Sequence, residues 1–178
     1  MKKSILVPIL TILCATLLLF GLNFGLKNTA KNNAQKENLT MMQTLLPGST
    51  EFTEEAYTGE DTNIRTIHKS EKGYVIETVT AGYAGNITML IGVSNEGTVT
   101  GLVVRDMSET FGLGANALND HEFLAQFLNT SGEAAVGTNV DAISGATVTS
   151  KAIARCVNSA VAYVTGADAD SGATSWGG

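Results

Sequence analysis

An uncharged apolar segment near the start of the chain most constrains what this molecule can be. Ile5 to Leu26 contains no Asp, Glu, Lys or Arg, and lysines lie on both sides of it. At about 1.5 Å per helical residue, its roughly 22 residues span about 33 Å, which is enough to cross a bilayer core of about 30 Å. The segment predicts a transmembrane anchor, with residues 1–26 forming a short stub and a membrane-spanning helix.

Two other fates of this segment have less support. A cleaved signal peptide has an apolar region of about 7–15 residues and a small-residue cleavage site, whereas this run is longer and continues as KNTAKNNAQ. A lipoprotein would need small residues before Cys14, which instead follows TIL at residues 11–13. The short stub and the large C-terminal part favour a single-pass protein of the cell (inner) membrane, with its N-terminus in the cytoplasm and its domain outside.

The composition excludes several classes of function. The 178 residues carry a formal net charge of −6, which disfavours a nucleic-acid partner because phosphate neutralisation needs clustered basic residues. Two cysteines, Cys14 and Cys156, are too few for a zinc or iron–sulfur site of about four ligands. His68 and His121 have no partner at metal-ligand spacing, and no serine sits in a G-x-S-x-G elbow. We therefore expect no metal and no catalytic residue.

The rest of the chain predicts an α+β domain behind a juxtamembrane segment. Residues 27–36 are polar and predict a linker, and 37–46 have helical spacing that ends at Pro47-Gly48. Short alternating β-branched runs predict an antiparallel hairpin or meander, at residues 74–79, 87–93 and 99–104. Amphipathic helices are expected over 120–129 and 149–165. The expected organisation is linker and helix over 27–60, an α+β domain over 61–166, and a flexible tail over 167–178.

The segment between the last two expected helices carries the most chemical information. Residues 141–150 read DAISGATVTS, a glycine-containing turn rich in hydroxyl groups that leads directly into a helix. Free backbone N–H groups and the helix dipole make such a position suitable for a phosphate, and Lys151 adds a positive charge nearby. The alternative is an ordinary helix cap, in which Ser144, Thr147 or Thr149 satisfies the first donors of the helix.

This segment resembles the flavin-attachment motif of the FMN-binding domain family, Asp-x-x-Ser-Gly-Ala-Thr-x-Thr. In that family a dedicated flavin transferase joins FMN through a phosphoester to the last threonine, with FAD as the donor. The resemblance implies that Thr149 is the covalent acceptor and that Asp141 leads the motif. The residues that would shape the loop around the cofactor are Ser144, Gly145, Ala146 and Thr147.

Two further motifs of the same family occur upstream in the expected order. Residues 82–87, GYAGNI, resemble its Gly-Tyr-x-Gly-x-Ile motif before the central strand. Residues 109–114, ETFGLG, resemble its Glu-Thr-Pro-Gly-Leu-Gly loop, with Phe111 where proline is usual. Proline would fix φ near −65°, so this departure alters the local loop and leaves the attachment site untouched. From this loop the resemblance adds four cofactor contacts, Glu109, Thr110, Leu113 and Gly114.

The three motifs and the N-terminal anchor together resemble the G-type subunit of the Rnf ion-translocating oxidoreductase complexes. The resemblance implies an extracytoplasmic electron-transfer subunit with covalent FMN, in a complex that couples ferredoxin:NAD⁺ electron transfer to sodium or proton movement. Its partners would be the other membrane subunits and the flavin transferase. Two alternatives stay open: a component like the C-type subunit of a sodium-pumping NADH:quinone oxidoreductase, and a stand-alone exported flavoprotein that shuttles electrons.

Two segments imitate functional motifs. Residues 112–117, GLGANA, fit the dinucleotide fingerprint G-x-G-x-x-A, yet no βαβ unit of about 30 residues surrounds them. Residues 168–176, DADSGATSW, repeat the attachment spacing, but Trp176 stands at the acceptor position and has no oxygen to esterify. We expect neither segment to bind a cofactor.

Overall fold

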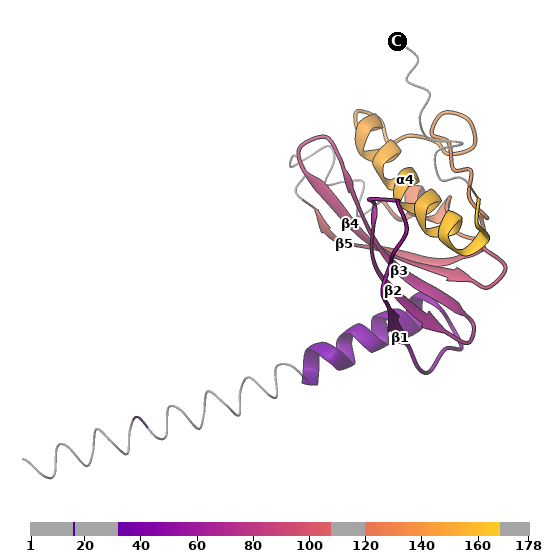
Figure 1. Cartoon of the computed structure of the whole chain (residues 1–178). Helices are drawn as coiled ribbons and strands as arrows, with labels where there is room; N and C mark the ends of the chain where they lie inside the picture. Colours follow the sequence, from indigo (N-terminus) through magenta and orange to yellow (C-terminus); the bar gives the residue numbers. More distant parts are fainter. Residues whose placement is uncertain (1–15, 17–31, 108–119, 168–178) are drawn as a thin grey trace, which may run out of the picture. The chain divides into compact units, whose positions relative to one another are not determined.

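The computed structural model describes Thr16, residues 32–107 and residues 120–167 (Figure 1). The predicted anchor, Ile5–Leu26, lies outside these residues except for Thr16. Among the described residues, none of the helices has the length and apolar character needed to cross a membrane. The chain divides into two compact units, Met1–Met41 and Met42–Gly178.

Residues 32–45 are helical. The helix thus includes residues 32–36, which the sequence analysis assigned to a linker. The Thr40 hydroxyl donates to the Lys36 carbonyl at 2.9 Å, a side-chain contact within one helical turn. The helix ends before Pro47, and Gly48 follows with a φ of +85°, a left-handed conformation that glycine adopts without strain.

The second unit contains a five-stranded antiparallel sheet, and this confirms the predicted meander. Neighbouring strands are consecutive in the chain, in the order β1-β2-β3-β4-β5. The strands are β1 (Thr53–Glu55), β2 (Ile64–Ser70), β3 (Gly73–Ala81), β4 (Asn86–Ser94) and β5 (Val99–Met107). The sheet begins before residue 61, because β1 pairs with β2 through Thr53 opposite Lys69.

Two helices follow the sheet, and both differ slightly from their predicted bounds. α3 (His121–Ala125) is capped by Asp120, whose carboxylate accepts from Phe123 N at 3.0 Å. It is shorter than the predicted 120–129, because the chain continues in turns to Asn129, whose φ of 61° is left-handed. α4 (Thr147–Thr165) starts two residues earlier than predicted and ends at Gly166 in the left-handed region.

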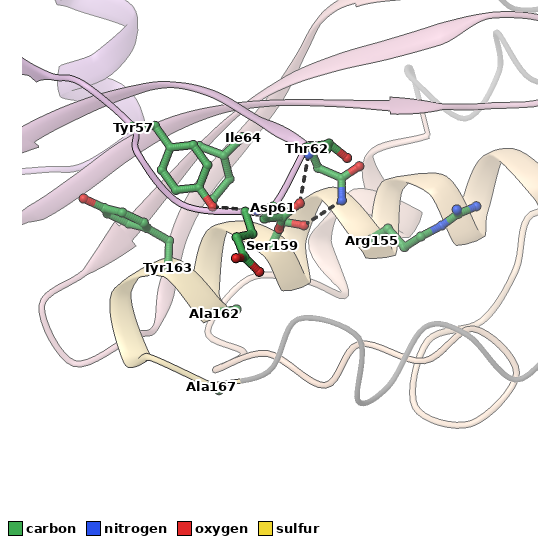
Figure 2. A pocket seen from close by; sticks show the side chains of 11 residues that line it. Tyr57, Asp61, Thr62, Ile64, Arg155, Ser159, Ala162, Tyr163 and Ala167 are labelled. Atoms are coloured by element: carbon green, nitrogen blue, oxygen red, sulfur yellow. Dashed lines mark hydrogen bonds between the residues drawn. The ribbon is translucent and has the colours of Figure 1, made fainter.

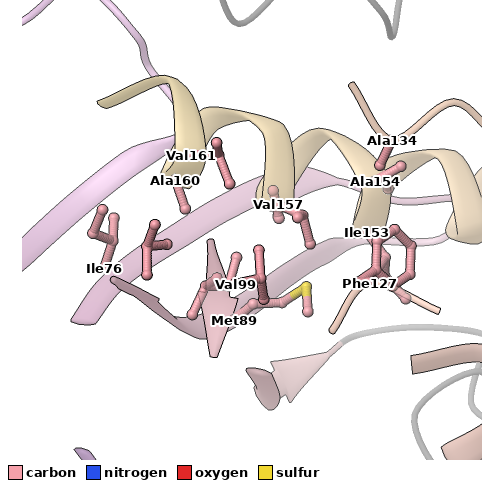
Figure 3. Packing of buried hydrophobic residues seen from close by; sticks show 14 of the residues in the cluster. Ile76, Met89, Val99, Phe127, Ala134, Ile153, Ala154, Val157, Ala160 and Val161 are labelled. Carbon is pink, nitrogen blue, oxygen red and sulfur yellow. The ribbon is translucent and has the colours of Figure 1, made fainter. Parts of the chain in front are cut away.

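The hydrophobic core lies between α4 and one face of the sheet (Figure 3). From α4, Ile153, Val157 and Val161 point inward at the spacing of one helical face. Opposite them lie residues of alternating strand positions, including Ile76 and Met89, which have no exposed surface. This layer of apolar side chains fixes α4 across β3 and β4.

The direction of α4 brings its start to a defined end of the sheet. A Cβ at Gly97, in the β4–β5 turn, would contact the Thr165 side chain, so the end of α4 lies at that turn. The 19 residues of α4 span about 28 Å and the nine of β4 about 30 Å. The start of α4 therefore lies at the opposite end, with the turn between β3 and β4 (Figure 1).

The other face of the sheet has a notch made by two glycines. Gly92 and Gly101 are direct cross-strand partners in β4 and β5. The Leu45 backbone lies in this notch: a Cβ on Gly101 would be 2.9 Å from Leu45 Cα, and one on Gly92 would be 2.7 Å from the Leu45 carbonyl carbon. Thr100 donates its hydroxyl to the Leu45 carbonyl at 2.5 Å. The notch and this bond hold residues 45–46 against the sheet.

We predict that Gly92→Ala destabilises the domain, because a methyl group there overlaps Leu45 backbone that cannot rotate away. Overpacking of this kind costs about 1–3 kcal/mol. Urea unfolding of the detergent-solubilised chain, followed by circular dichroism, measures the effect. Glu71→Ala, at an exposed turn, serves as the control and should stay within about 0.5 kcal/mol of the unmodified chain. An unchanged midpoint for Gly92→Ala would show that the notch is not tightly packed.

Candidate functional site

The start of α4 lacks the side-chain cap that most helices have. Its N-cap residue is Ala146, with φ −126° and ψ 36°, and no side chain of the described residues accepts a hydrogen bond from the first turn. Gly145, just before it, has a φ of +78°, which requires glycine for an unstrained backbone. The alternative interpretation of residues 141–150 as an ordinary helix cap is therefore wrong, since no threonine or serine hydroxyl performs that role.

The electrostatics of this helix start favour an anion. The N–H groups of Thr147, Val148 and Thr149 have no hydrogen-bond partner among residues 32–107 and 120–167. The first turn contains no acidic residue, and Lys151 follows in the second. Unpaired N–H groups at the positive end of the helix dipole are suited to bind a phosphate.

Two side chains fix the loop that leads into α4. Ser150 is fully buried, and its hydroxyl donates to the Ala146 carbonyl at 3.0 Å and accepts from Ile143 N at 3.2 Å. Gln126 binds the other end of the loop, because its amide oxygen accepts from Asp141 N at 2.8 Å and its amide nitrogen donates to the Asp141 carbonyl at 3.4 Å. Both ends of the loop are thus held in place by specific hydrogen bonds.

The predicted attachment residues differ sharply in exposure. Ser144, Gly145 and Thr147 are exposed, and Ala146 is buried. Thr149, the predicted acceptor, is only 1% exposed. The motif residues therefore surround the helix start as predicted, while the acceptor side chain is enclosed in the folded domain.

The upstream motif lies at the same end of the sheet. Gly82 to Gly85 form the turn between β3 and β4, with Gly82 N donating to the Gly85 carbonyl at 2.7 Å. Tyr83 in this turn is 73% exposed. Ile87 begins the core-facing positions of β4 and is fully buried. The turn and the start of α4 thus lie near one another in space, although about 60 residues separate them in the chain.

Other predicted elements lie outside the described residues. These are the loop contacts Glu109, Thr110, Leu113 and Gly114, together with the imitation motifs at 112–117 and 168–176. His68 lies in β2 and His121 in α3. Across residues 32–107 and 120–167, no three His, Cys, Asp or Glu side chains gather where they could hold a metal ion.

Cys156 is a buried core residue. It has no exposed surface, and burial raises the pKa of its thiol to about 11. The thiol is therefore protonated at neutral pH, and thiolate chemistry is disfavoured there. This agrees with the sequence-based interpretation of Cys156 as a small core residue.

A cavity of about 520 Å³, not predicted from the sequence, lies on the side of α4 that faces the segment before β2 (Figure 2). From α4 come Arg155 and Ser159, four residues apart on one helical face. That spacing was a usable signal in the sequence, because it places two polar side chains together on a face of α4 other than the apolar one. From the segment before β2 come Tyr57, Glu60, Asp61, Thr62 and Asn63, and Ile64 at the start of β2 also lines the cavity.

Residues 82–162 match the FMN-binding domain family. This range contains the turn at Gly82–Gly85, the start of α4 and Thr149. The match confirms the family resemblance that the three motifs predicted.

Three curated relatives resemble the chain over about half of its length, and each is the G-type subunit of its complex. The first, from an ion-translocating oxidoreductase complex of Methanosarcina acetivorans, is 42% identical over 97 residues, covering 52% of this chain and 51% of the relative. The second, from a proton-translocating ferredoxin:NAD(+) oxidoreductase complex of Clostridium ljungdahlii, is 37% identical, covering 52% and 53%. The third, from a Na(+)-translocating ferredoxin:NAD(+) oxidoreductase complex of Acetobacterium woodii, is 36% identical, covering 50% and 47%. The chain thus spans about half the length of the curated relatives it matches.

We predict that Ser150→Ala loosens the loop before α4, because it leaves the part-buried Ile143 N–H without its acceptor. The free energy of unfolding should fall by about 1 kcal/mol, the usual net contribution of one hydrogen bond. Thr147→Ala, an exposed position three residues away, should change stability by at most about 0.5 kcal/mol. Chemical denaturation of both variants measures the difference, and equal stabilities would contradict the proposed role of Ser150.

Proposed function

We propose that this chain is an electron-transfer subunit that carries FMN as a phosphoester on Thr149. The observation that carries the proposal is the uncapped start of α4. There the residues of an FMN-attachment motif lie beside three N–H groups that have no partner in the described part of the chain, inside the segment that matches the FMN-binding domain. FMN would supply the redox chemistry, since it accepts and donates electrons.

The residues at this site fit the phosphate end of FMN. The N–H groups of Thr147, Val148 and Thr149 are available donors, and the helix dipole and Lys151 supply positive potential for a phosphate. The loop held by Ser150 keeps these donors in place. Burial of Thr149 would keep the ester bond away from water. The described residues thus bind, orient and shield the attachment point.

The names of the three relatives support a proposal about the larger complex in which this chain acts. All three are named as G-type subunits of ion-translocating complexes, and two of the names specify ferredoxin:NAD(+) oxidoreductases. We infer that this chain has the same place in such a complex, where it passes electrons between other membrane subunits. Either sodium or protons would be the coupling ion. Co-purification of this chain with membrane subunits would separate this role from that of a stand-alone exported flavoprotein.

We propose that the protein acts at the outer side of the cell membrane. Ile5–Leu26 would anchor the chain, with its N-terminus in the cytoplasm. Covalent attachment suits such a location, because a dissociating cofactor would be lost to the exterior.

We predict that Thr149→Ala abolishes covalent flavin, because alanine has no oxygen to form the phosphoester. The chain is produced together with its flavin transferase and separated on a denaturing gel under ultraviolet light. The unmodified chain should fluoresce, and Thr149→Ala should be dark. Thr149→Ser keeps a hydroxyl and should show partial labelling.

Thr174→Ala is the matched control, because it makes the same change within the imitation motif of the tail. It should fluoresce as strongly as the unmodified chain. Persistent fluorescence of Thr149→Ala, with the flavin peptide mapped to Thr147 or Ser150, would assign the acceptor to another hydroxyl. A dark unmodified chain, despite an active transferase, would rule out covalent flavin altogether.

We predict further that the chain stays with membranes after an alkaline carbonate wash, because its apolar segment is long enough to span them. Protease added to right-side-out vesicles should digest residues 32–178. Protection of these residues until the vesicles are inverted would reverse the proposed topology. A mature N-terminus beyond residue 26 would show that the segment is cleaved.

A further inference from the structure

The cavity beside α4 is separate from the proposed flavin-attachment loop. Its walls come from the segment between β1 and β2 and from the face of α4 that carries Arg155, Ser159 and Tyr163 (Figure 2). None of the motif residues at 141–150 lines it. Its volume of about 520 Å³ is within the range of small-molecule sites, about 300–1,000 Å³.

A network of hydrogen bonds holds the polar wall of this cavity in one conformation. The Tyr57 hydroxyl accepts from Asp61 N at 2.9 Å, and Asp61 Oδ1 accepts from Asn63 N at 2.8 Å. Asn63 Nδ2 then donates to Ser159 Oγ at 3.2 Å, which connects this segment to α4. The wall is therefore prearranged, and its side chains do not depend on a ligand for their positions.

Two charged groups in the cavity each have a buried polar atom without a partner among the residues that the structure describes. Asp61 Oδ2 is an unused acceptor, and Arg155 Nε is an unused donor. The two side chains form no ion pair with each other or with another described residue. Buried polar groups are almost always hydrogen-bonded in folded proteins, so an unpaired acceptor and an unpaired donor in one cavity indicate missing partners.

The apolar wall is aromatic. Tyr57 and Tyr163 meet edge to face, with ring centroids 6.0 Å apart, and Ile64 and Ala162 also line the cavity. Aromatic and aliphatic side chains of this kind bind the apolar body of a ligand, while a few polar groups set its orientation.

We propose that this cavity binds a small zwitterion that carries a protonated amine and a carboxylate, the class of amino acids and short peptides. The amine donates to Asp61, and the carboxylate accepts from Arg155. A simple cation would be repelled by the positive charge of Arg155, and a simple anion would be repelled by the carboxylates of Asp61 and Glu60. A ligand with both charges pairs each of the two groups with an opposite charge, and an apolar side chain on it would contact Tyr57 and Tyr163.

The dipeptide alanyl-phenylalanine is a suitable probe, because it carries both charges and an aromatic ring. Saturation-transfer-difference NMR on the full chain in detergent micelles detects its binding, with empty micelles as the blank. The unmodified chain should give a saturable signal. N-acetyl and C-terminal amide forms of the same dipeptide each remove one charge and should bind at least about tenfold more weakly.

Two substitutions test whether Asp61 and Arg155 bind the dipeptide. Asp61→Asn and Arg155→Gln should each weaken dipeptide binding at least about tenfold, since each removes one charged partner. Arg65→Gln and Glu71→Gln are the matched controls, because they remove the same charges at exposed positions outside the cavity. These controls should bind like the unmodified chain, and thermal unfolding checks that all four variants are folded.

The binding of the N-acetyl and amide dipeptides is measured on the unmodified chain. The proposal therefore stays testable even if a cavity variant fails to fold. Absence of a saturable signal with the dipeptide would overturn the proposal. Equal binding of the dipeptide and its N-acetyl or amide form would overturn it as well. The result is independent of the proposed function, because a Thr149→Ala chain without flavin should bind the dipeptide with the same affinity.

Discussion

The packing of α4 across β3 and β4 is the interaction on which the rest of this domain depends. Ile153, Val157 and Val161 bury one helical face against the sheet, and this contact fixes both the position and the direction of the helix. Because α4 is rigid over 19 residues, its start and its flank are placed by the same core. The start lies at the same end of the sheet as the turn between β3 and β4, and the flank forms one wall of the cavity.

The parts of the fold that depend on residue periodicity were predictable. Alternation over 74–79, 87–93 and 99–104 marks three strands, and the spacing of Ile153, Val157 and Val161 marks α4. β1 has only three residues and no recognisable pattern, so its pairing with β2 is visible only in three dimensions. The helical residues 32–36 were assigned to a linker because they are polar, yet a solvated helix needs no apolar face at every turn.

The candidate site was predictable in its residues and less so in its geometry. The spacing from Asp141 to Thr149 located the loop, and this loop lies within the residues that match the FMN-binding domain, 82–162. The sequence could not show that Ala146 starts the helix without a cap, because hydroxyl-bearing residues surround it and any of them could have served. It also could not reveal the cavity, since Asp61 and Arg155 are distant in the chain and only the tertiary packing brings both to one cavity.

If Thr149 carries the flavin, as we propose, its enclosed position would impose an order on the maturation of the protein. With its side chain 1% exposed, Thr149 is out of reach of another protein while the domain is closed. A transferase would therefore have to act before the start of α4 settles, or during a local opening that breaks the bonds of Ser150 and Gln126. The free energy of that opening would limit how fast the cofactor is loaded. Once the loop had closed, the same free energy would limit access of water to the ester, so one local equilibrium would govern both the loading of the cofactor and the lifetime of its bond.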